Sequence, residues 1–209
     1  MIEILIPVIA YLLGSIPTAV LIGKYFYGID VREKGSGNAG ATNTFRILGA
    51  KAAIPVLFID ILKGFLAVKL ILISGLGHQP EALKIQMLSG ILASLGHIFP
   101  VFAKFRGGKG VATLTGVVLA IEPNALLFAL PVFILTVLIT RFVSLGSILA
   151  TVSLPFVFLF ILHLTRFEYL VFSLIIITIV IFTHWKNILR LMEGKENAFS
   201  LNRKSHDSK

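Results

Sequence analysis

The sequence contains no cysteine, and only 14% of its 209 residues are charged, with ten Asp and Glu in total. The lack of cysteine excludes disulfides, zinc–thiolate sites, iron–sulfur clusters and a cysteine nucleophile. No His, Asp and Glu residues occur at metal-ligand spacing, so we expect neither a metal nor another cofactor. Because a soluble domain carries about 25% charged residues, the low charge excludes an ordinary soluble domain.

Common catalytic signatures are missing as well. The chain has no Gly-x-Ser-x-Gly elbow, no His followed five residues later by Asp, and no Asp-rich motif of the kind that membrane alcohol-phosphate transferases carry. An activated nucleophile is therefore not visible in the sequence.

Long apolar segments dominate the chain, which is 56% hydrophobic with a mean hydropathy of +0.94. A helix that crosses a bilayer needs about 20 mostly apolar residues. Five segments meet this requirement or come close to it: 4–23, 52–77, 85–103, 142–165 and 169–185. The sequence therefore predicts an all-α, polytopic integral membrane bundle.

The stretch 110–140 is harder to interpret because Glu122-Pro123 divides it. The first piece has 12 residues, which rise only ~18 Å as a helix, too short to cross unaided. Either this piece begins inside the glycine-rich segment before it, or the two pieces form a re-entrant hairpin. We prefer about seven transmembrane helices in total.

The distribution of Lys and Arg predicts the orientation. With the N-terminus outside and the C-terminus inside, 15 of the 19 Lys and Arg residues lie in inside segments, and only Lys84 and Arg166 lie in outside loops. The polar segments then gather at one cytoplasmic face. We expect one membrane domain, 1–196, followed by a polar, mobile cytoplasmic tail, 197–209.

The first of these polar segments is Gly35 to Asn43, followed by Arg46. Three of its first six residues are glycine, and such a backbone can point successive N–H groups at one anion. The short side chains add donors, and Arg46 can hold a phosphate through two hydrogen bonds. The segment predicts a phosphate site; the alternative is a flexible polar turn. The donors and glycines concerned are Ser36, Gly37, Asn38, Gly40, Thr42 and Asn43.

The second segment, 104–113, places Gly107-Gly108 between Lys104 and Lys109, before an apolar stretch. Glycines and lysines at a helix N-terminus are typical of a phosphate site. The segment is not a nucleotide P-loop, because no strand precedes it. The alternative is a basic anchor at the membrane surface, which suits Arg106 but leaves the glycines unexplained.

The third segment lies at the end of the last apolar stretch. On a helix, His184, Asn187 and Arg190 fall three residues apart and share roughly one face, and Gly194 and Glu196 follow. These side chains could position a hydroxyl or a phosphate, and His184 could act as a general base. The alternative is a hydrated helix end at the membrane surface.

Two charged residues lie inside an apolar stretch. Asp60 and Lys63 are three residues apart, so they can meet on one helix face, and burying either alone is expensive. We favour a structural role over one in the floor of a site. His97 lies in the third span and could face the same polar cluster.

The constellation is rich in anion-binding groups and poor in acids. It suits a phosphorylated substrate whose own hydroxyl is the nucleophile, or the passage of an anion across the membrane.

These residues resemble those of a known family, the bacterial acyl-phosphate:glycerol-3-phosphate acyltransferases, or PlsY family. Residues 35–46 resemble its first motif, 96–113 its second and 184–196 its third. The similarity extends from residue 13 to residue 196 and includes 60–64 and 141–145. At Thr183 the chain departs from the family, which often has Arg before the His.

The resemblance implies transfer of a fatty acyl group from acyl phosphate to the 1-hydroxyl of glycerol 3-phosphate, yielding lysophosphatidic acid and phosphate. We then expect a monomer in the bacterial cytoplasmic membrane, in contact with membrane lipid, without a nucleic-acid partner, and with its active site at the cytoplasmic face. Ser36, Arg46, Lys104, His184 and Asn187 would be the catalytic residues. The substrate-binding residues would be Gly37, Asn38, Gly40, Thr42, Asn43, Gly107, Gly108, Lys109, Ser144, Arg190 and Glu196.

Two alternatives belong to other classes of protein. A small anion transporter could use the same glycine-rich loops, but it should show inverted repeats or charges along a path to both faces. A structural membrane subunit would leave those loops unexplained.

Overall fold

A computed structural model describes residues 2–199, and these residues form helices and connecting turns without a strand. Nine α-helices are joined by short 3₁₀ turns and one π-helical turn within this range. The α-helices are α1 (Ile2–Gly14), α2 (Thr18–Tyr27), α3 (Ala41–Leu48), α4 (Ala50–Ile73), α5 (Ala82–Ile98), α6 (Val111–Ile121), α7 (Leu126–Thr140), α8 (Val143–Phe156) and α9 (Phe167–Met192). The short turns are η1 (Val31–Glu33), η2 (Leu76–His78), η3 (Val101–Ala103), η4 (Pro123–Ala125) and η5 (Val157–Ile161).

Five helical segments are long and apolar enough to cross a bilayer. They are Ile2–Tyr27, Ala82–Ala103, Pro123–Thr140, Val143–Ile161 and Phe167–Met192. Helix α4, with 24 residues, is long enough as well but carries Asp60, Lys63 and Lys69. The prediction of an all-helical membrane protein is thereby confirmed, whereas the number of crossings and the orientation stay predictions.

The first predicted span, 4–23, is broken rather than continuous. Helix α1 ends at Gly14, and α2 begins at Thr18 after Pro17. Proline has no N–H and disfavours helical geometry in the residue before it, so the chain turns here. The Ser15 hydroxyl donates to the Tyr11 carbonyl at 2.9 Å, an oxygen that also accepts from Ser15 N.

The stretch that sequence left ambiguous forms two helices with different neighbours. Helix α6 packs against α4, α7 packs against α8, and η4 joins α6 to α7 at the expected Glu122-Pro123 break. Glycines allow the first of these contacts, because a Cβ at Gly64 would collide with the Thr113 carbonyl and one at Gly116 with the Ile61 carbonyl. Small residues of this kind let membrane helices approach closely.

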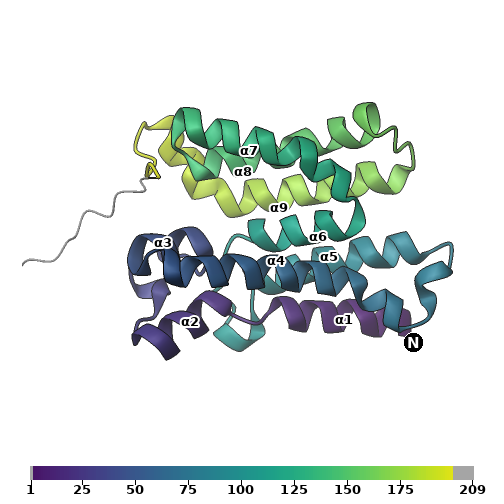
Figure 1. Ribbon diagram of the computed structural model, residues 1–209, viewed down its shortest axis with the longest axis horizontal. Coiled ribbons are helices and arrows are strands. Elements are labelled where there is room, and N and C mark those ends of the chain that lie inside the picture. Colours follow the sequence, from purple (N-terminus) through teal and green to yellow (C-terminus); the bar gives the residue numbers. More distant parts are fainter. Residues whose placement is uncertain (1, 200–209) are drawn as a thin grey trace, which may run out of the picture.

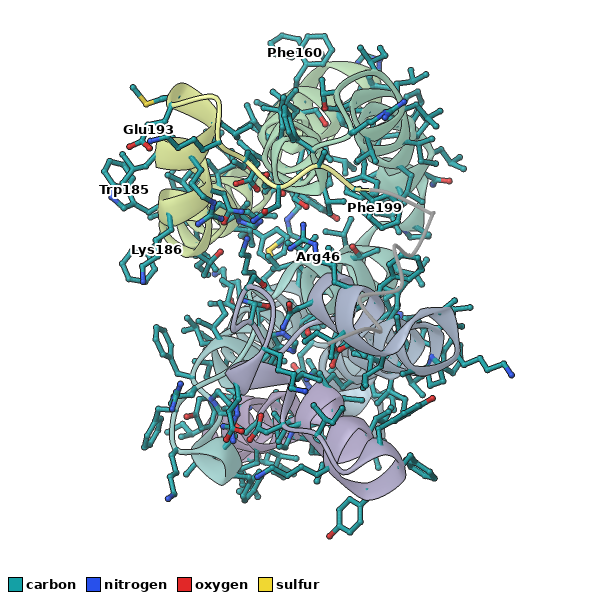
Figure 2. All side chains as sticks on the ribbon, turned by 90° about the vertical axis from the view of Figure 1, so that its left-hand side faces the viewer. Arg46, Phe160, Trp185, Lys186, Glu193 and Phe199 are labelled. Carbon is teal, nitrogen blue, oxygen red and sulfur yellow. The ribbon has the colours of Figure 1, made fainter. Side chains whose placement is uncertain are left out.

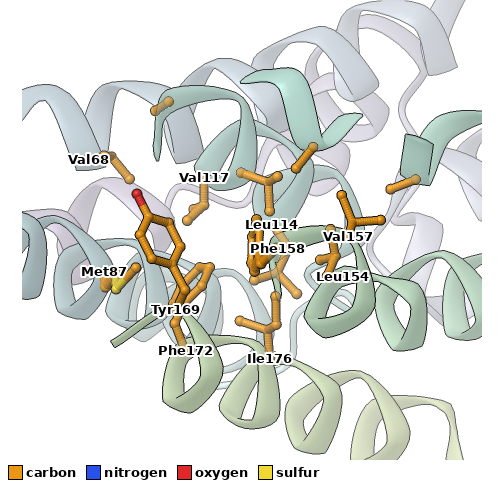
Figure 3. Close-up of a cluster of buried hydrophobic side chains, with 14 of the residues drawn as sticks. Val68, Met87, Leu114, Val117, Leu154, Val157, Phe158, Tyr169, Phe172 and Ile176 are labelled. Carbon is orange, nitrogen blue, oxygen red and sulfur yellow. The ribbon is translucent and has the colours of Figure 1, made fainter. Parts of the chain in front are cut away.

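The helices form two layers, with α7, α8 and α9 above the other six in Figure 1. A cluster of buried apolar side chains joins the layers (Figure 3), including Val117 of α6, Phe158 of η5 and Phe172 and Ile176 of α9. Helices α2 and α3 and the C-terminal end of α9 lie at one end of the molecule, and the N-terminus lies at the other. The predicted polar segments therefore gather at a single end.

Candidate active site

A cavity of about 1170 Å³ lies where the three predicted segments meet. Its apolar wall comes from the helices α4, α6, α7, α8 and α9, with Leu57, Leu114, Phe133 and Ile176 among its residues. A space lined by both polar and apolar side chains can hold an amphipathic ligand. The predicted residues on the polar wall are Ser36, Gly37, Asn38, Gly40, Thr42, Asn43, Arg46, Lys109, Ser144, His184, Asn187, Arg190 and Glu196.

Two helix N-termini border this cavity without a capping side chain. Helix α3 begins after Gly40 and α6 after Gly110, and neither residue can supply a cap. The first helical hydrogen bonds run from Thr44 N to Gly40 O and from Leu114 N to Gly110 O, so the three amides before each are left for another partner. Since helix N-termini attract anions, the polar wall offers two places for negative groups.

Asn43 organises the first glycine segment from inside. Its side chain is buried, and its amide nitrogen donates to the carbonyls of Val31 at 2.8 Å, Asn38 at 3.0 Å and Lys34 at 3.2 Å. Its amide oxygen accepts from Ser36 N at 2.9 Å. The Asn43 side chain is therefore occupied in shaping the loop, and its backbone N–H is the group left for a substrate.

Glu196 connects the end of α9 to α8. One carboxylate oxygen accepts hydrogen bonds from Ser144 Oγ at 2.8 Å and Asn187 Nδ2 at 2.6 Å, and the other pairs with Arg190 Nε at 2.8 Å. Burial alone would raise the pKa of Glu196, but the bonds from Asn187, Ser144 and Arg190 outweigh it, and the net pKa is lowered. A charged Glu196 thus holds Asn187 and Arg190 in place.

Lys109 joins the second segment to the third. Its ammonium donates to Asn187 Oδ1 at 2.5 Å, so Asn187 stands between a cation and the Glu196 carboxylate. Burial lowers the pKa of Lys109 to about 8, with Glu196 opposing the shift and Arg190 and Arg46 adding to it. Arg46, Lys109 and Arg190 share the polar wall with the Glu196 carboxylate, and this excess of positive charge leaves it attractive to anions.

His184 is buried, with 2% of its surface exposed. Its Nδ1 lies 2.8 Å from the Val180 carbonyl. Because a carbonyl oxygen can only accept a hydrogen bond, Nδ1 carries the proton, and Nε2 of the neutral ring is an acceptor. The ring can accept a hydrogen bond from a substrate hydroxyl.

Arg46 lies between the two layers when the molecule is viewed from the end that carries α3 (Figure 2). Its guanidinium donates to the Asn197 carbonyl at 3.3 Å. Trp185 and Lys186 project outward from α9 in the same view, although both border the cavity. Trp185 is 57% exposed, which agrees with the alternative that this part of α9 faces the membrane surface.

Comparisons with known proteins give the family. A family model described as glycerol-3-phosphate acyltransferase matches residues 4–194. The chain belongs to the glycerol-3-phosphate acyltransferase family. Among relatives of that name, one from Trichlorobacter lovleyi is 50% identical over 190 residues, covering 91% of this chain and 94% of the relative. Another, from Chlorobaculum tepidum, is 40% identical over 224 residues, covering 95% and 97%.

Solved structures agree with this family assignment. The crystal structure of PlsY, described as an integral membrane glycerol 3-phosphate acyltransferase in its glycerol 3-phosphate form, is 40% identical and superposes with a TM-score of 0.85 over 96% of each chain. Its lysophosphatidic acid form is 38% identical, with a TM-score of 0.83 over 97% of this chain and 98% of that one. The predicted family and the membrane architecture are thereby confirmed.

The structure does not bring every predicted residue of this acyltransferase to the cavity. Gly107 N donates to the Ile98 carbonyl at 3.2 Å, and Gly108 N donates to the His97 carbonyl at 3.1 Å. Neither amide is free for a phosphate, so the place of Gly107 and Gly108 in substrate binding stays a prediction that cannot rest on these N–H groups. The two glycines allow close packing instead, because a Cβ at Gly107 would collide with His97 O and one at Gly108 with the His97 ring.

Lys104 is exposed and lies beside a separate hollow, together with Asp30 and Arg32. It does not line the main cavity. Among the basic residues of the second segment, Lys109 is the one that reaches the polar wall.

Sequence reasoning missed a short segment, 197–199, that returns to the body of the protein and borders the cavity. Phe199 N donates to the Arg141 carbonyl at 2.7 Å, and the Phe199 ring lies 5.2 Å from that of Phe45. Residues 197–199, assigned to a free tail, are therefore attached to the body, while 200–209 lie outside the described residues. A short polar segment with one aromatic residue carries little sequence signal for such a contact.

Proposed function

We propose that this chain transfers a fatty acyl group from acyl phosphate to the 1-hydroxyl of sn-glycerol 3-phosphate. The products are lysophosphatidic acid and inorganic phosphate. The observation that carries the proposal is the cavity in which two uncapped helix N-termini and three cations meet an apolar wall. The charged wall suits the phosphate groups of the two substrates, and the apolar wall suits the long acyl chain of one of them.

The reaction needs no covalent intermediate. The substrate hydroxyl attacks the acyl carbonyl carbon, a new C–O bond forms, the bond from that carbon to the phosphate oxygen breaks, and phosphate departs with the electron pair. Acyl phosphate has a good leaving group, so the protein chiefly positions the reactants and stabilises charge. Ser36 could in principle accept the acyl group, but within residues 2–199 its hydroxyl has no hydrogen-bonded base.

Arg46, Lys109 and Arg190 are the cations proposed to hold the two phosphates, with the amides of Ala41–Asn43 and Val111–Thr113. Lys104 stays a prediction, and its place outside the cavity lining favours Lys109 for this role. His184 and Asn187 orient the glycerol 3-phosphate. The proton of the attacking hydroxyl passes to His184 Nε2 or to a phosphate oxygen of a substrate, and we favour the phosphate.

We propose a monomer in the bacterial cytoplasmic membrane, with about seven crossings and the cavity open to the cytoplasm. The rival interpretation, an anion transporter, predicts a polar path to both faces, whereas apolar residues predominate in the cavity wall away from the three segments, where Asp60, His97, Thr115, Ser147 and Thr151 are the polar ones.

An assay of purified protein with radiolabelled glycerol 3-phosphate tests the reaction. Acyl phosphate should support formation of labelled lysophosphatidic acid, and acyl-CoA should not. Product from acyl-CoA, or none from acyl phosphate with folded protein, would contradict the proposal.

A further inference from the structure

Three ionisable side chains are buried together beside the cavity. Asp60 and Lys63 lie on α4, His97 lies near the end of α5, and they are 1%, 3% and 7% exposed. Lys63 Nζ is 2.9 Å from Asp60 Oδ1, and His97 Nδ1 is 3.6 Å from the same oxygen. Asp60 and His97 also line the cavity. Burying ionisable side chains inside a membrane bundle costs free energy. We therefore expect this cluster to have a role beyond packing.

One side of the cluster is tied to the break in the first span. Lys63 Nζ donates to the Ile16 carbonyl at 3.1 Å. Ile16 lies between α1 and α2, where the helical hydrogen-bond pattern is interrupted. The contact therefore connects α4 to this break.

The other side of the cluster touches the second glycine segment. The His97 ring packs so closely on Gly108 that a Cβ there would collide with Nε2. The His97 carbonyl also accepts from Gly108 N at 3.1 Å. His97 therefore contacts Gly108 through both its ring and its carbonyl.

The second glycine segment is bonded in turn to the first. Ala39 N donates to the Gly107 carbonyl at 3.4 Å. Ala39 lies two residues before the start of α3, and Gly110 is the residue before α6. The position of His97 is therefore transmitted to both helix N-termini that border the cavity.

We propose that Asp60 and His97 are positioning residues that set the separation of the α3 and α6 N-termini for two phosphate groups. The inference rests on the proposed function, because it assumes that these termini hold the substrates. The buried carboxylate pairs with Lys63 and faces His97 Nδ1 at 3.6 Å, and His97 in turn contacts the second glycine segment at Gly108.

The test compares two substitutions at one position. His97→Leu fills the space but has no N–H to place near Asp60, whereas His97→Asn retains one. A displacement of the glycine segments should raise KM for glycerol 3-phosphate in the Leu variant by roughly 10- to 100-fold, with a smaller change in kcat. The Asn variant should recover most of this loss.

Lys69→Met supplies the matched control. Lys69 lies on the same helix, and its ammonium also donates to a backbone carbonyl, that of Ala120, at 3.0 Å. It touches neither glycine segment, so its loss should lower thermal stability and leave both KM values unchanged. If His97→Leu does not fold, Asp60→Asn replaces it, since it keeps the volume and removes the charge.

Calorimetric titration of glycerol 3-phosphate separates this inference from the proposed function. Weaker binding to the Leu variant than to the Asn variant and wild type supports it. Equal binding to all three, or an equal loss in all variants including Lys69→Met, would overturn it. Absence of binding to folded wild-type protein would instead remove the proposed function on which the inference rests.

Discussion

Arg46 and Lys104 carry the same charge at the same end of the molecule, but only Arg46 lines the cavity. The loss of a charge-assisted phosphate contact costs about 1.5–3 kcal/mol, or roughly 10- to 150-fold in kcat/KM. We expect Arg46→Ala to show a loss of this size and Lys104→Ala a smaller one, measured on folded protein. Equal losses would return Lys104 to the site, and wild-type kinetics for Arg46→Ala would remove Arg46 from it.

His184 has two possible roles that kinetics distinguish. If it only orients glycerol 3-phosphate, His184→Ala should raise KM while largely keeping kcat. If it is the base, kcat should fall by roughly 10²–10⁴-fold and the acidic limb of the pH–rate profile should disappear. We expect the first result, because Nδ1 is held by a backbone carbonyl rather than by a carboxylate. A folded variant with both constants unchanged would exclude either role.

Lys109 should set the upper pH limit of the acyltransferase activity. Its pKa is lowered to about 8 by burial, so the ammonium is charged below that pH and loses its proton as the pH rises through it. A phosphate monoester stays dianionic over this range, since its second pKa is about 6. We expect kcat/KM for glycerol 3-phosphate to fall above about pH 8, and Lys109→Arg to move this limb upward. An unshifted limb in the Arg variant would assign it to another group.

At the scale of helices, the crossing of α4 and α6 supports the site because α6 begins at the cavity. Gly116→Ala would place a methyl group against the Ile61 carbonyl, a backbone atom that cannot move away by itself. Overpacking of this kind costs typically about 1–3 kcal/mol, so the melting temperature in detergent should fall. Gly146→Ala is the matched control: its nearest neighbour is a Val137 methyl group at 2.8 Å, and we expect a smaller drop. A larger drop in melting temperature for Gly146→Ala than for Gly116→Ala would show that the α4–α6 contact can accommodate the extra methyl group.

The end of α9 makes contacts in the site that its sequence does not reveal. The spacing of His184, Asn187 and Arg190 predicts a common face. The structure adds Glu196, which returns from beyond the helix to bond Asn187, Arg190 and Ser144. The position of Glu196 depends on the turn that follows α9. Helical periodicity predicts which residues share a face of a helix, but it does not predict the path of the chain after the helix ends.

For the whole molecule, the orientation in the membrane is a prediction from the distribution of charge. The chain has no cysteine, so single cysteines introduced at Gly77 and Asn197 can be labelled without background. With the N-terminus outside, an impermeant reagent on intact cells should reach position 77 and not position 197, and a permeant reagent should reach both. Labelling of both positions by the impermeant reagent would contradict the topology.

The sequence by itself determined the membrane class, the helical architecture and the family. Apolar length decides which segments cross a bilayer, because the bilayer thickness is given, and Glu122-Pro123 marks the turn between α6 and α7 through local backbone chemistry. The three polar segments were also recognisable, because glycine, Arg, Lys and His in those patterns suit phosphate chemistry. None of these inferences requires knowing which residues distant along the chain touch.

Tertiary structure alone decided which of those polar groups are available. Gly107 and Gly108 look like phosphate-binding glycines, yet their amides bond to the end of α5. Lys104 and Lys109 are five residues apart, and only Lys109 reaches the cavity. The attachment of Phe199 to the Arg141 carbonyl depends equally on long-range packing. A hydrogen-bond donor binds a substrate only if no protein group has taken it, and that depends on neighbours brought together by the fold.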